Sequence, residues 1–315
     1  NDEDGGSMYC DFKKQWGGFS DFYDQITKLS EVRLATSGCT VNQGAGDGIN
    51  HGDDAFAKLG VGIIDGQRFP GRCYDKVLGT TDGMEATWAT KHQDAVNGKL
   101  HRYLAHLAET RDDGPTQATQ WNIWKTYASF DGYDTLIHGM NIPAAEFSLF
   151  DHGLDAWGSP LKTVLSWACK SNMLLYDATA NVQGALNAGA TVALAPDWTE
   201  SGMPNMLAEL NYAAYVARDS GWSIQSRLFV EMVTRNAASG FGQLYRIGSL
   251  EEGKVANLMV IPDGDGDPFD DFMMAAGAGA SYDYRCGPKD VKLTVVAGRP
   301  MYGDPDLLTT ANFPF

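Results

Sequence analysis

The run Thr191–Ala195 constrains the fold of this chain more than any other stretch. It follows the helix-ending signal Asn187-Ala-Gly189 and leads directly to a proline and to Asp197. These features predict a short strand that is buried on both faces, as in a parallel sheet covered by helices. Asp197 then lies where the chain leaves the sheet. In barrels of alternating strands and helices, catalytic groups occupy this position, although an Asp there can also simply cap the next helix.

The same alternation of strands and helices continues along residues 21–240. It predicts a parallel α/β architecture. Further strands are predicted at Cys39–Gln43, Val61–Asp65, Tyr74–Leu78, Arg102–Leu107, Thr135–His138 and Thr163–Ala168. Helices are predicted at Asp21–Thr36, Gly83–Val96, Thr116–Ala128, Ala144–His152, Val182–Ala188, Pro204–Arg218 and Ile224–Ala238.

The two ends of the chain differ from this middle part. Residues 1–20 are rich in Gly and Asp and predict an irregular arm, whereas residues 241–315 are β-rich with tight turns. Strands are predicted there at Ala256–Ile261, Val291–Ala297 and Arg299–Tyr302. Because so few strands do not form an independent sandwich, we expect them to complete a small β-sandwich part whose other strands lie elsewhere.

The loop Asp263–Asp267 begins like a calcium-binding EF-hand loop. Pro268 stands where the motif needs Gly, and Met274 where a Glu should close it. A turn is therefore favoured over a calcium site.

Composition excludes some classes of function. With 315 residues, 43% hydrophobic and 20% charged, the chain can bury a large globular core. Its formal charge of −16 argues against nucleic acid or an anionic membrane as a partner. No run is long enough to span a membrane, and no signal peptide is recognisable. The five cysteines form no CxxC motif, which argues against zinc-ribbon and thioredoxin-like sites and leaves their pairing open.

Three predicted strands end in titratable groups: His106, His138 and Asp197. Two imidazoles and one carboxylate form a ligand set that suits zinc or iron, and a bound metal would acidify water near neutral pH. Glu109, three residues after His106, could move protons if burial tunes its pKa. Each residue alone has an ordinary alternative as a hydrogen-bonding group, and an α/β binding protein without metal remains open. The occurrence of three such residues at strand ends favours a metal or catalytic site.

From about residue 100 to 305, ordered motifs resemble the second half of the metal-dependent amidohydrolase superfamily. The resemblance is to its deaminase and chlorohydrolase branch, which includes cytosine and guanine deaminases. As an ordered set the motifs are specific, whereas any one alone would be weak. They are His106-Leu-Ala-Glu109, Leu136-Ile-His138-Gly139, Ser171-Asn172 with Leu175-Tyr176, Val192-Ala-Leu-Ala-Pro-Asp197-Trp198, Leu207-Ala-Glu209-Leu210, Ile247-Gly-Ser-Leu-Glu-Glu-Gly-Lys254, and Val295-Val-Ala-Gly298-Arg-Pro300-Met-Tyr302-Gly-Asp304.

This resemblance implies a TIM-like barrel of eight strands and helices with a flanking β-sandwich. His106 would end strand five and bind a divalent metal, with zinc expected first and iron as the alternative. His138 would end strand six and bind the metal or polarise the scissile group. Asp197 would end strand eight and bind the metal or activate the water. Glu109 would be the proton shuttle of the deaminase branch.

The sequence departs from the family pattern at several points. The family's His-x-His on strand one, which supplies two further ligands, is absent from the 315 residues. Cys169-Lys170 replaces a common Pro-Arg, and Asn257 replaces the usual Asp. We therefore expect that a separate N-terminal segment or chain supplies strand one and His-x-His.

The resulting functional hypothesis is a hydrolase of C–N bonds that acts on a small cyclic or amide substrate. The alternative is a catalytically inactive relative with a binding or assembly role. The start Asn1-Asp-Glu-Asp, without an initiator Met, favours a processed chain and a secreted or periplasmic location. A homo-oligomer is compatible with the sequence.

Overall fold

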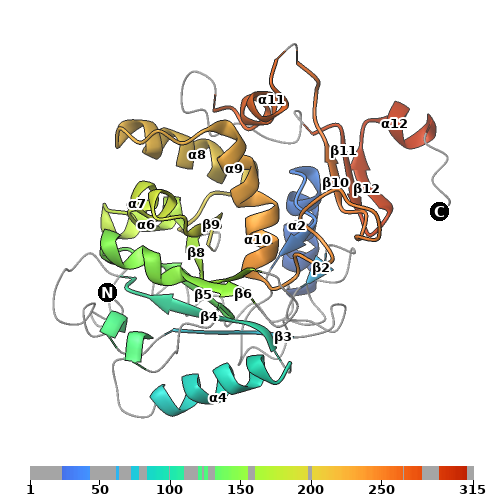
Figure 1. Ribbon diagram of the computed structural model, residues 1–315. Helices are drawn as coiled ribbons and strands as arrows, with labels where there is room; N and C mark the ends of the chain where they lie inside the picture. The colour runs from blue at the N-terminus through green and yellow to red at the C-terminus, as the bar shows by residue number, and fades with distance from the viewer. Residues whose placement is uncertain are drawn as a thin grey trace.

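A five-stranded parallel sheet forms the centre of the protein in the computed structural model (Figure 1). All neighbouring strands pair in parallel, so the predicted parallel α/β architecture is confirmed for this part of the chain. The strand order is β3 (Arg72–Val77), β4 (Leu100–Leu107), β5 (Asp134–His138), β8 (Val164–Trp167) and β9 (Thr191–Leu194).

The structure describes residues 23–42, 62–63, 72–77, 84–98, 100–109, 120–122, 124–126, 132–154, 160–197, 201–264, 266–278 and 291–310. The predicted arm at residues 1–20 lies outside this set, as does most of the predicted helix Thr116–Ala128. A second parallel pair, β1 (Val41–Asn42) and β2 (Gly62–Ile63), is not part of the central sheet, although Val41 packs against Leu104 of β4.

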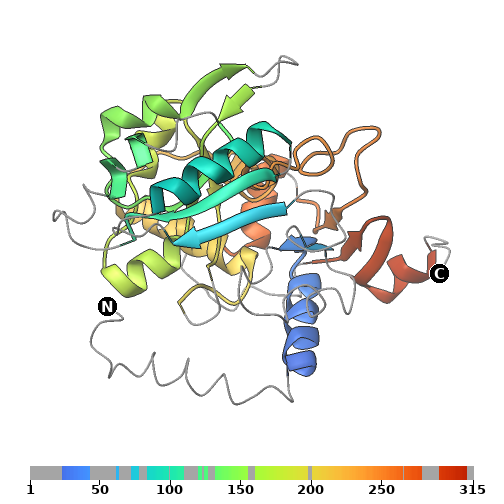
Figure 2. The same cartoon turned by 90° about the horizontal axis from the view of Figure 1, so that it is seen from below.

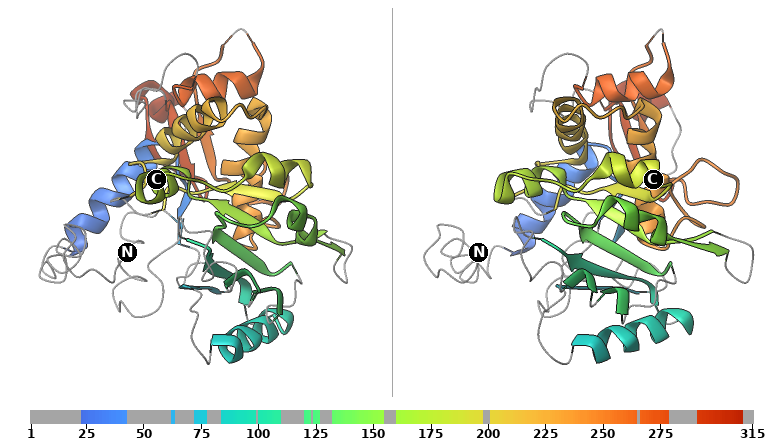
Figure 3. Two further views of the ribbon diagram at one scale, coloured as in Figure 1. Left: turned by 90° about the vertical axis from the view of Figure 1, so that its left-hand side faces the viewer. Right: turned by 60° about the vertical axis from the view of Figure 1, so that its left-hand side comes forward.

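Helices pack near both edges of the central sheet, on the β3–β4 side and on the β9 side (Figure 3). At one edge, α4 (Met84–Val96) contacts β4. At the other edge, α7, α9 and α10 contact β9, and α8 contacts α6 and α9. No helix in the described part of the chain is long and apolar enough to cross a bilayer. The bounds are α6 Cys169–Tyr176, α7 Val182–Asn187, α8 Met206–Asp219, α9 Ser226–Val233 and α10 Arg235–Gly240.

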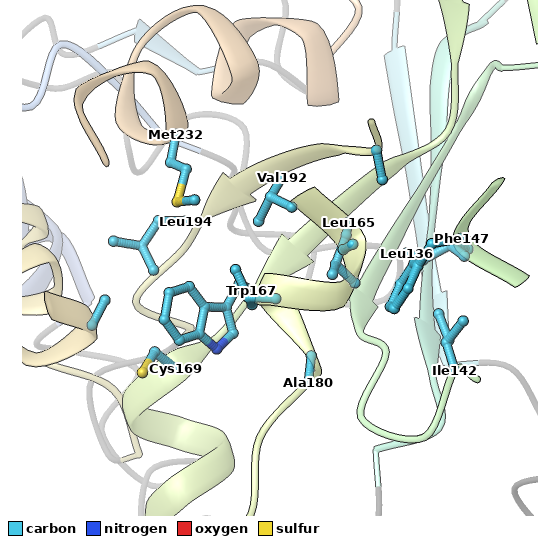
Figure 4. Packing of buried hydrophobic residues seen from close by; sticks show 14 of the residues in the cluster. Leu136, Ile142, Phe147, Leu165, Trp167, Cys169, Ala180, Val192, Leu194 and Met232 are labelled. Carbon is cyan, nitrogen blue, oxygen red and sulfur yellow. The ribbon is translucent and has the colours of Figure 1, made fainter. Parts of the chain in front are cut away.

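The run that the sequence predicts as doubly buried does form such a strand. Val192 and Leu194 of β9 are buried next to Leu165 and Trp167 of β8, and Met232 of α9 covers the end of β9 (Figure 4). Fully burying a side chain of this size is worth about 1.5–3 kcal/mol. These contacts fix the position from which the chain continues to the candidate site.

The C-terminal part forms a three-stranded antiparallel sheet in the order β10 (Leu258–Val260), β11 (Leu293–Val296) and β12 (Arg299–Gly303). Helix α2 (Tyr23–Thr36), from the start of the described chain, contacts β12 (Figure 2). Helix α12 (Pro305–Thr310) follows β12 directly. All three predicted C-terminal strands are present, each with slightly shifted bounds.

Two predicted helices are wrong in form. The segment predicted as the helix Ala144–His152 is a 3₁₀-helix over Ala144–Phe150, followed by the hairpin strands β6 (Asp151–Leu154) and β7 (Pro160–Lys162). Residues three apart align in a 3₁₀-helix, which places Phe147 and Phe150 together in the core. The predicted helix Ile224–Ala238 is broken into α9 and α10 at Thr234, whose φ of −122° and ψ of −96° are not helical.

The Asp-rich loop before residue 268 provides the N-terminal cap of a helix. Asp267 accepts a hydrogen bond from the Phe269 amide and caps α11 (Pro268–Ala275), which the sequence did not predict. Asp271 accepts from the Gly264 amide. These carboxylates therefore satisfy backbone donors at the start of α11 and in the loop before it.

Candidate active site

Three of the predicted site residues come together at the carboxyl ends of β4 and β5. The two strands are neighbours in parallel register, with Leu107 opposite His138. The ring centroids of His106 and His138 lie 5.5 Å apart. The Glu109 Oε1 atom lies 3.5 Å from His138 Nε2. The structure thus places His106, Glu109 and His138 in one cluster, as expected for residues that follow adjacent parallel strands.

The backbone at these strand ends is held in an uncommon conformation. Ala108, His138 and Asp197 have φ values of 53°, 69° and 60°, and they are three of the five described non-glycine residues with positive φ. Such conformations cost about 1–3 kcal/mol each and persist where the surrounding structure enforces them, often at functional sites. These conformations occur at the last residue of β5 and within three residues after the ends of β4 and β9.

The imidazole of His138 is fixed by Asn172 on α6. The two side chains are fully buried, and His138 Nδ1 lies 2.8 Å from Asn172 Oδ1. Because an amide oxygen only accepts hydrogen bonds, Nδ1 carries a proton, and in the neutral ring the lone pair is then on Nε2. The buried Nε2 has no hydrogen-bond partner among the described residues. This is the tautomer and outer hydrogen bond that a metal-binding histidine needs.

Glu109 has a second partner at the far end of α6. The Tyr176 hydroxyl donates to Glu109 Oε1 over 3.2 Å. The Glu109 side chain is 29% exposed, so its carboxylate is open to solvent on one side. A carboxylate held in place but open to water is suited to exchanging protons.

Asp197 is held by two hydroxyl groups. Ser171 donates to Asp197 Oδ2 over 2.6 Å, and Ser201 lies 3.3 Å from the same oxygen. Ser171 directly precedes Asn172, the partner of His138. Helix α6, which the sequence did not predict as a helix, therefore connects Asp197 with the histidine cluster.

The donor set fits a metal in part. An imidazole whose buried Nε2 makes no hydrogen bond, beside a second imidazole, suits a borderline cation such as zinc. Within the described ranges, however, no three His, Cys, Asp or Glu side chains come close enough to share one ion. The predicted metal set of His106, His138 and Asp197 thus stays a prediction.

Glu209, which has no role in the predicted site, is a buried carboxylate that interacts with the charge of Asp197. It belongs to the first turn of α8 and is fully buried. Burial raises the pKa of Glu209 to about 7, hydrogen bonds from the backbone N–H groups of Lys170 and Met203 act to lower it, and the charge of Asp197 acts to raise it. The available signal was an acidic residue inside the apolar motif Leu207-Ala-Glu209-Leu210.

The profile described as the amidohydrolase family matches residues 125–301, which is more than half of the chain. The chain belongs to the amidohydrolase family. The resemblance inferred from the ordered motifs is therefore confirmed. Comparison with curated protein sequences gives no match.

Solved structures show the same fold in other amidohydrolases. A zinc complex of atrazine chlorohydrolase from Arthrobacter aurescens is 20% identical, with a TM-score of 0.58 over 78% of this chain and 51% of that protein. A variant of that enzyme with zinc and atraton is 19% identical, with a TM-score of 0.69 over 93% and 76%. Guanine deaminase from E. coli is 15% identical, with a TM-score of 0.64 over 90% and 75%. The chain thus spans only about half of the first of these proteins.

Proposed function

We propose that this amidohydrolase is a metal-dependent hydrolase of C–N bonds, of the deaminase type, that acts on a small cyclic or amide substrate. The observation that carries the proposal is the cluster of His106, Glu109 and His138 at the carboxyl ends of two adjacent parallel strands. Active sites of TIM barrels lie at this end of the strands. The proposal includes a complete TIM-like barrel, a β-sandwich part built on β10–β12, and domain boundaries near residues 20 and 240.

In this proposal, His106, His138 and Asp197 would hold one divalent metal, zinc first and iron as the alternative. Metal binding would have to bring the three side chains closer together than they are in this structure. The metal would supply the acidity that turns water into a nucleophile near neutral pH. Asn172 keeps the proton on His138 Nδ1, and the hydroxyls of Ser171 and Ser201 orient the Asp197 carboxylate. Glu109 would carry a proton on the carboxylate that Tyr176 holds.

We further propose that the remaining ligands come from a segment that carries His-x-His, a motif absent from these 315 residues. That segment belongs either to the same polypeptide or to a separate companion chain. A homo-oligomer and a secreted or periplasmic location are retained as hypotheses. An intact-mass measurement on native material, followed by denaturing separation, tests for a companion chain.

The substrate class can be narrowed by assay. The names of two similar structures specify guanine and atrazine, both nitrogen heterocycles. We expect ammonia release from aminated heterocycles, measured on native material with its metal content determined by mass spectrometry. Chloride release from chlorinated heterocycles without ammonia release would instead indicate a hydrolase of C–Cl bonds. Fully metallated material, including any companion segment, that turns over none of them would favour the alternative of an inactive relative.

Glu109→Gln tests the proposed proton carrier. Removing a positioned acid–base group lowers the rate by about 10²–10⁴-fold, and the metal content should stay nearly unchanged. Glu146→Gln is the matched control, because the Glu146 side chain is 30% exposed, against 29% for Glu109, and it binds Lys125 outside the cluster. Parallel loss of metal and activity would make Glu109 a ligand, and an unchanged rate would remove it from the mechanism.

A further inference from the structure

We propose that Glu209 is a positioning residue, which joins the start of α6 to the loop after β9 and thereby orients His138 and Asp197. The inference rests on the proposed function only for the roles of those two residues. The contacts themselves are independent of any reaction.

The Glu209 carboxylate bridges two separate segments of the chain. Its Oε1 accepts a hydrogen bond from the Lys170 backbone N–H over 2.9 Å. Its Oε2 accepts from the Met203 backbone N–H over 3.2 Å. Each oxygen therefore holds one segment, and the carboxylate is fully buried between them.

The start of α6 needs such an acceptor. The first amides of a helix have no partner within the helix, and a Ser, Thr, Asp or Asn at the N-cap normally accepts from one of them. The N-cap of α6 is Ala168, which makes no side-chain hydrogen bond. Glu209 supplies the missing acceptor from another helix, and a negative charge at this end is also favourable for the helix dipole.

Both bridged segments lead directly to the candidate site. Ser171 and Asn172 follow Lys170, and they bind Asp197 and His138 respectively. Ser201 lies two residues before Met203, and its hydroxyl is 3.0 Å from that of Ser171 and 3.3 Å from Asp197 Oδ2. A shift of either segment would move the groups that orient the two site residues.

The two backbone donors account for a carboxylate at this buried position. Burying a carboxylate costs free energy, and two amide hydrogen bonds recover only part of it, as the raised pKa of Glu209 indicates. An apolar side chain would avoid that cost, but it would leave the backbone N–H groups of Lys170 and Met203 without this acceptor. A carboxylate is the group that can accept from both backbone donors at once.

The test observes His138 directly in the full chain without metal. Nuclear magnetic resonance of the histidine side chains reports the tautomer of each ring and the exchange rate of its N–H proton. In the unsubstituted protein we expect one tautomer of His138, protonated on Nδ1 and slow to exchange. The measurement is made at pH 8, above the raised pKa of Glu209, where its carboxylate accepts from both backbone donors. Glu209→Gln then sets an amide NH₂ against one of these donors. The His138 Nδ1 proton should then exchange about tenfold faster, a factor that corresponds to about 1.4 kcal/mol, the order of one net hydrogen bond.

Asp134→Asn is the matched control. Asp134 is also fully buried and accepts a hydrogen bond from Thr163, but it begins β5, whereas His138 ends the same strand. This variant should lower thermal stability and leave the His138 signals unchanged. Glu209→Asp, whose side chain is one methylene shorter, should change the His138 exchange rate in the same direction by less, and it serves if the Gln variant does not fold.

Unchanged His138 signals in a folded Glu209 variant would overturn the proposal, as would equal changes in the Asp134 control. Because the measurement uses neither metal nor substrate, its result is separate from the outcome of the activity assays. A negative result in the activity assays would therefore not decide whether Glu209 positions His138.

Discussion

Glu209 should make the stability of this protein depend on pH in an unusual direction. Most carboxylates in folded proteins are stabilised in their charged form, whereas burial raises the pKa of Glu209 from 4.5 to about 7. Between these two values the unfolded chain has lost its proton and the folded protein still holds it. The unfolded state then binds fewer protons, so the contribution of Glu209 to stability falls as pH rises.

The size of this effect follows from the pKa difference. The contribution is fully present below pH 4.5, decreases through neutrality and levels off above about pH 7. The shift corresponds to about 3 kcal/mol between the two plateaus. Glu209→Gln removes the titrating group. The difference in unfolding free energy, variant minus unsubstituted protein, should therefore increase by about this amount from the acidic plateau to the plateau above pH 7.

Urea unfolding at a series of pH values from 4 to 8, with metal removed by a chelator, measures this difference. Glu146→Gln is a control of opposite sign. Although partial burial acts to raise the pKa of Glu146, hydrogen bonds from Trp121 and Lys125 lower it overall. Its contribution is therefore present above its ordinary pKa and lost in acid. A Glu209→Gln difference that stays constant with pH, or that slopes like the Glu146 control, would refute the reasoning.

Three further predictions concern the site and its surroundings. Tyr176→Phe removes the hydroxyl that holds Glu109, and turnover should fall by about tenfold, the order of one hydrogen bond, while a kcat equal to the parent would exclude that role. Gly139→Ala should destabilise the protein by more than about 1 kcal/mol in denaturant titrations, because Gly139 has a φ of 55° and a new Cβ would lie 2.6 Å from Leu165 Cδ1. Burial raises the pKa of Cys39 to about 11 and the pKa of Cys169 well above its ordinary value. Both thiols should therefore react slowly with a thiol reagent at pH 8 until the protein unfolds. Fast labelling of either cysteine, located by peptide mass spectrometry, would contradict this.

Much of the central sheet could be predicted from local sequence. Short apolar runs bounded by turn signals predicted β4, β5, β8 and β9 within two residues at each end, because strands buried on both faces leave a continuous hydrophobic pattern. The proximity of His106 and His138 follows from the same pattern, because neighbouring parallel strands end at the same edge of the sheet. The family resemblance was likewise carried by ordered local motifs.

Local sequence predicted less well where tertiary contacts override local preference. The break between α9 and α10 at Thr234 has no proline or glycine to mark it, and helix α6 begins at an alanine without a side-chain cap. In α6 the missing acceptor is Glu209, which lies 39 residues further along the chain. A long-range cap of this kind leaves no periodic signal near the helix that it stabilises.

The sequence by itself determined the parallel α/β class, the family, and the four residues His106, Glu109, His138 and Asp197 as candidates. Only the tertiary structure decided how they are held. The tautomer of His138 depends on Asn172, and the orientation of Asp197 depends on Ser171. The physical reason is that side-chain types and strand ends are local properties of the sequence. Hydrogen-bond partners and burial depend on segments that meet only when the chain folds.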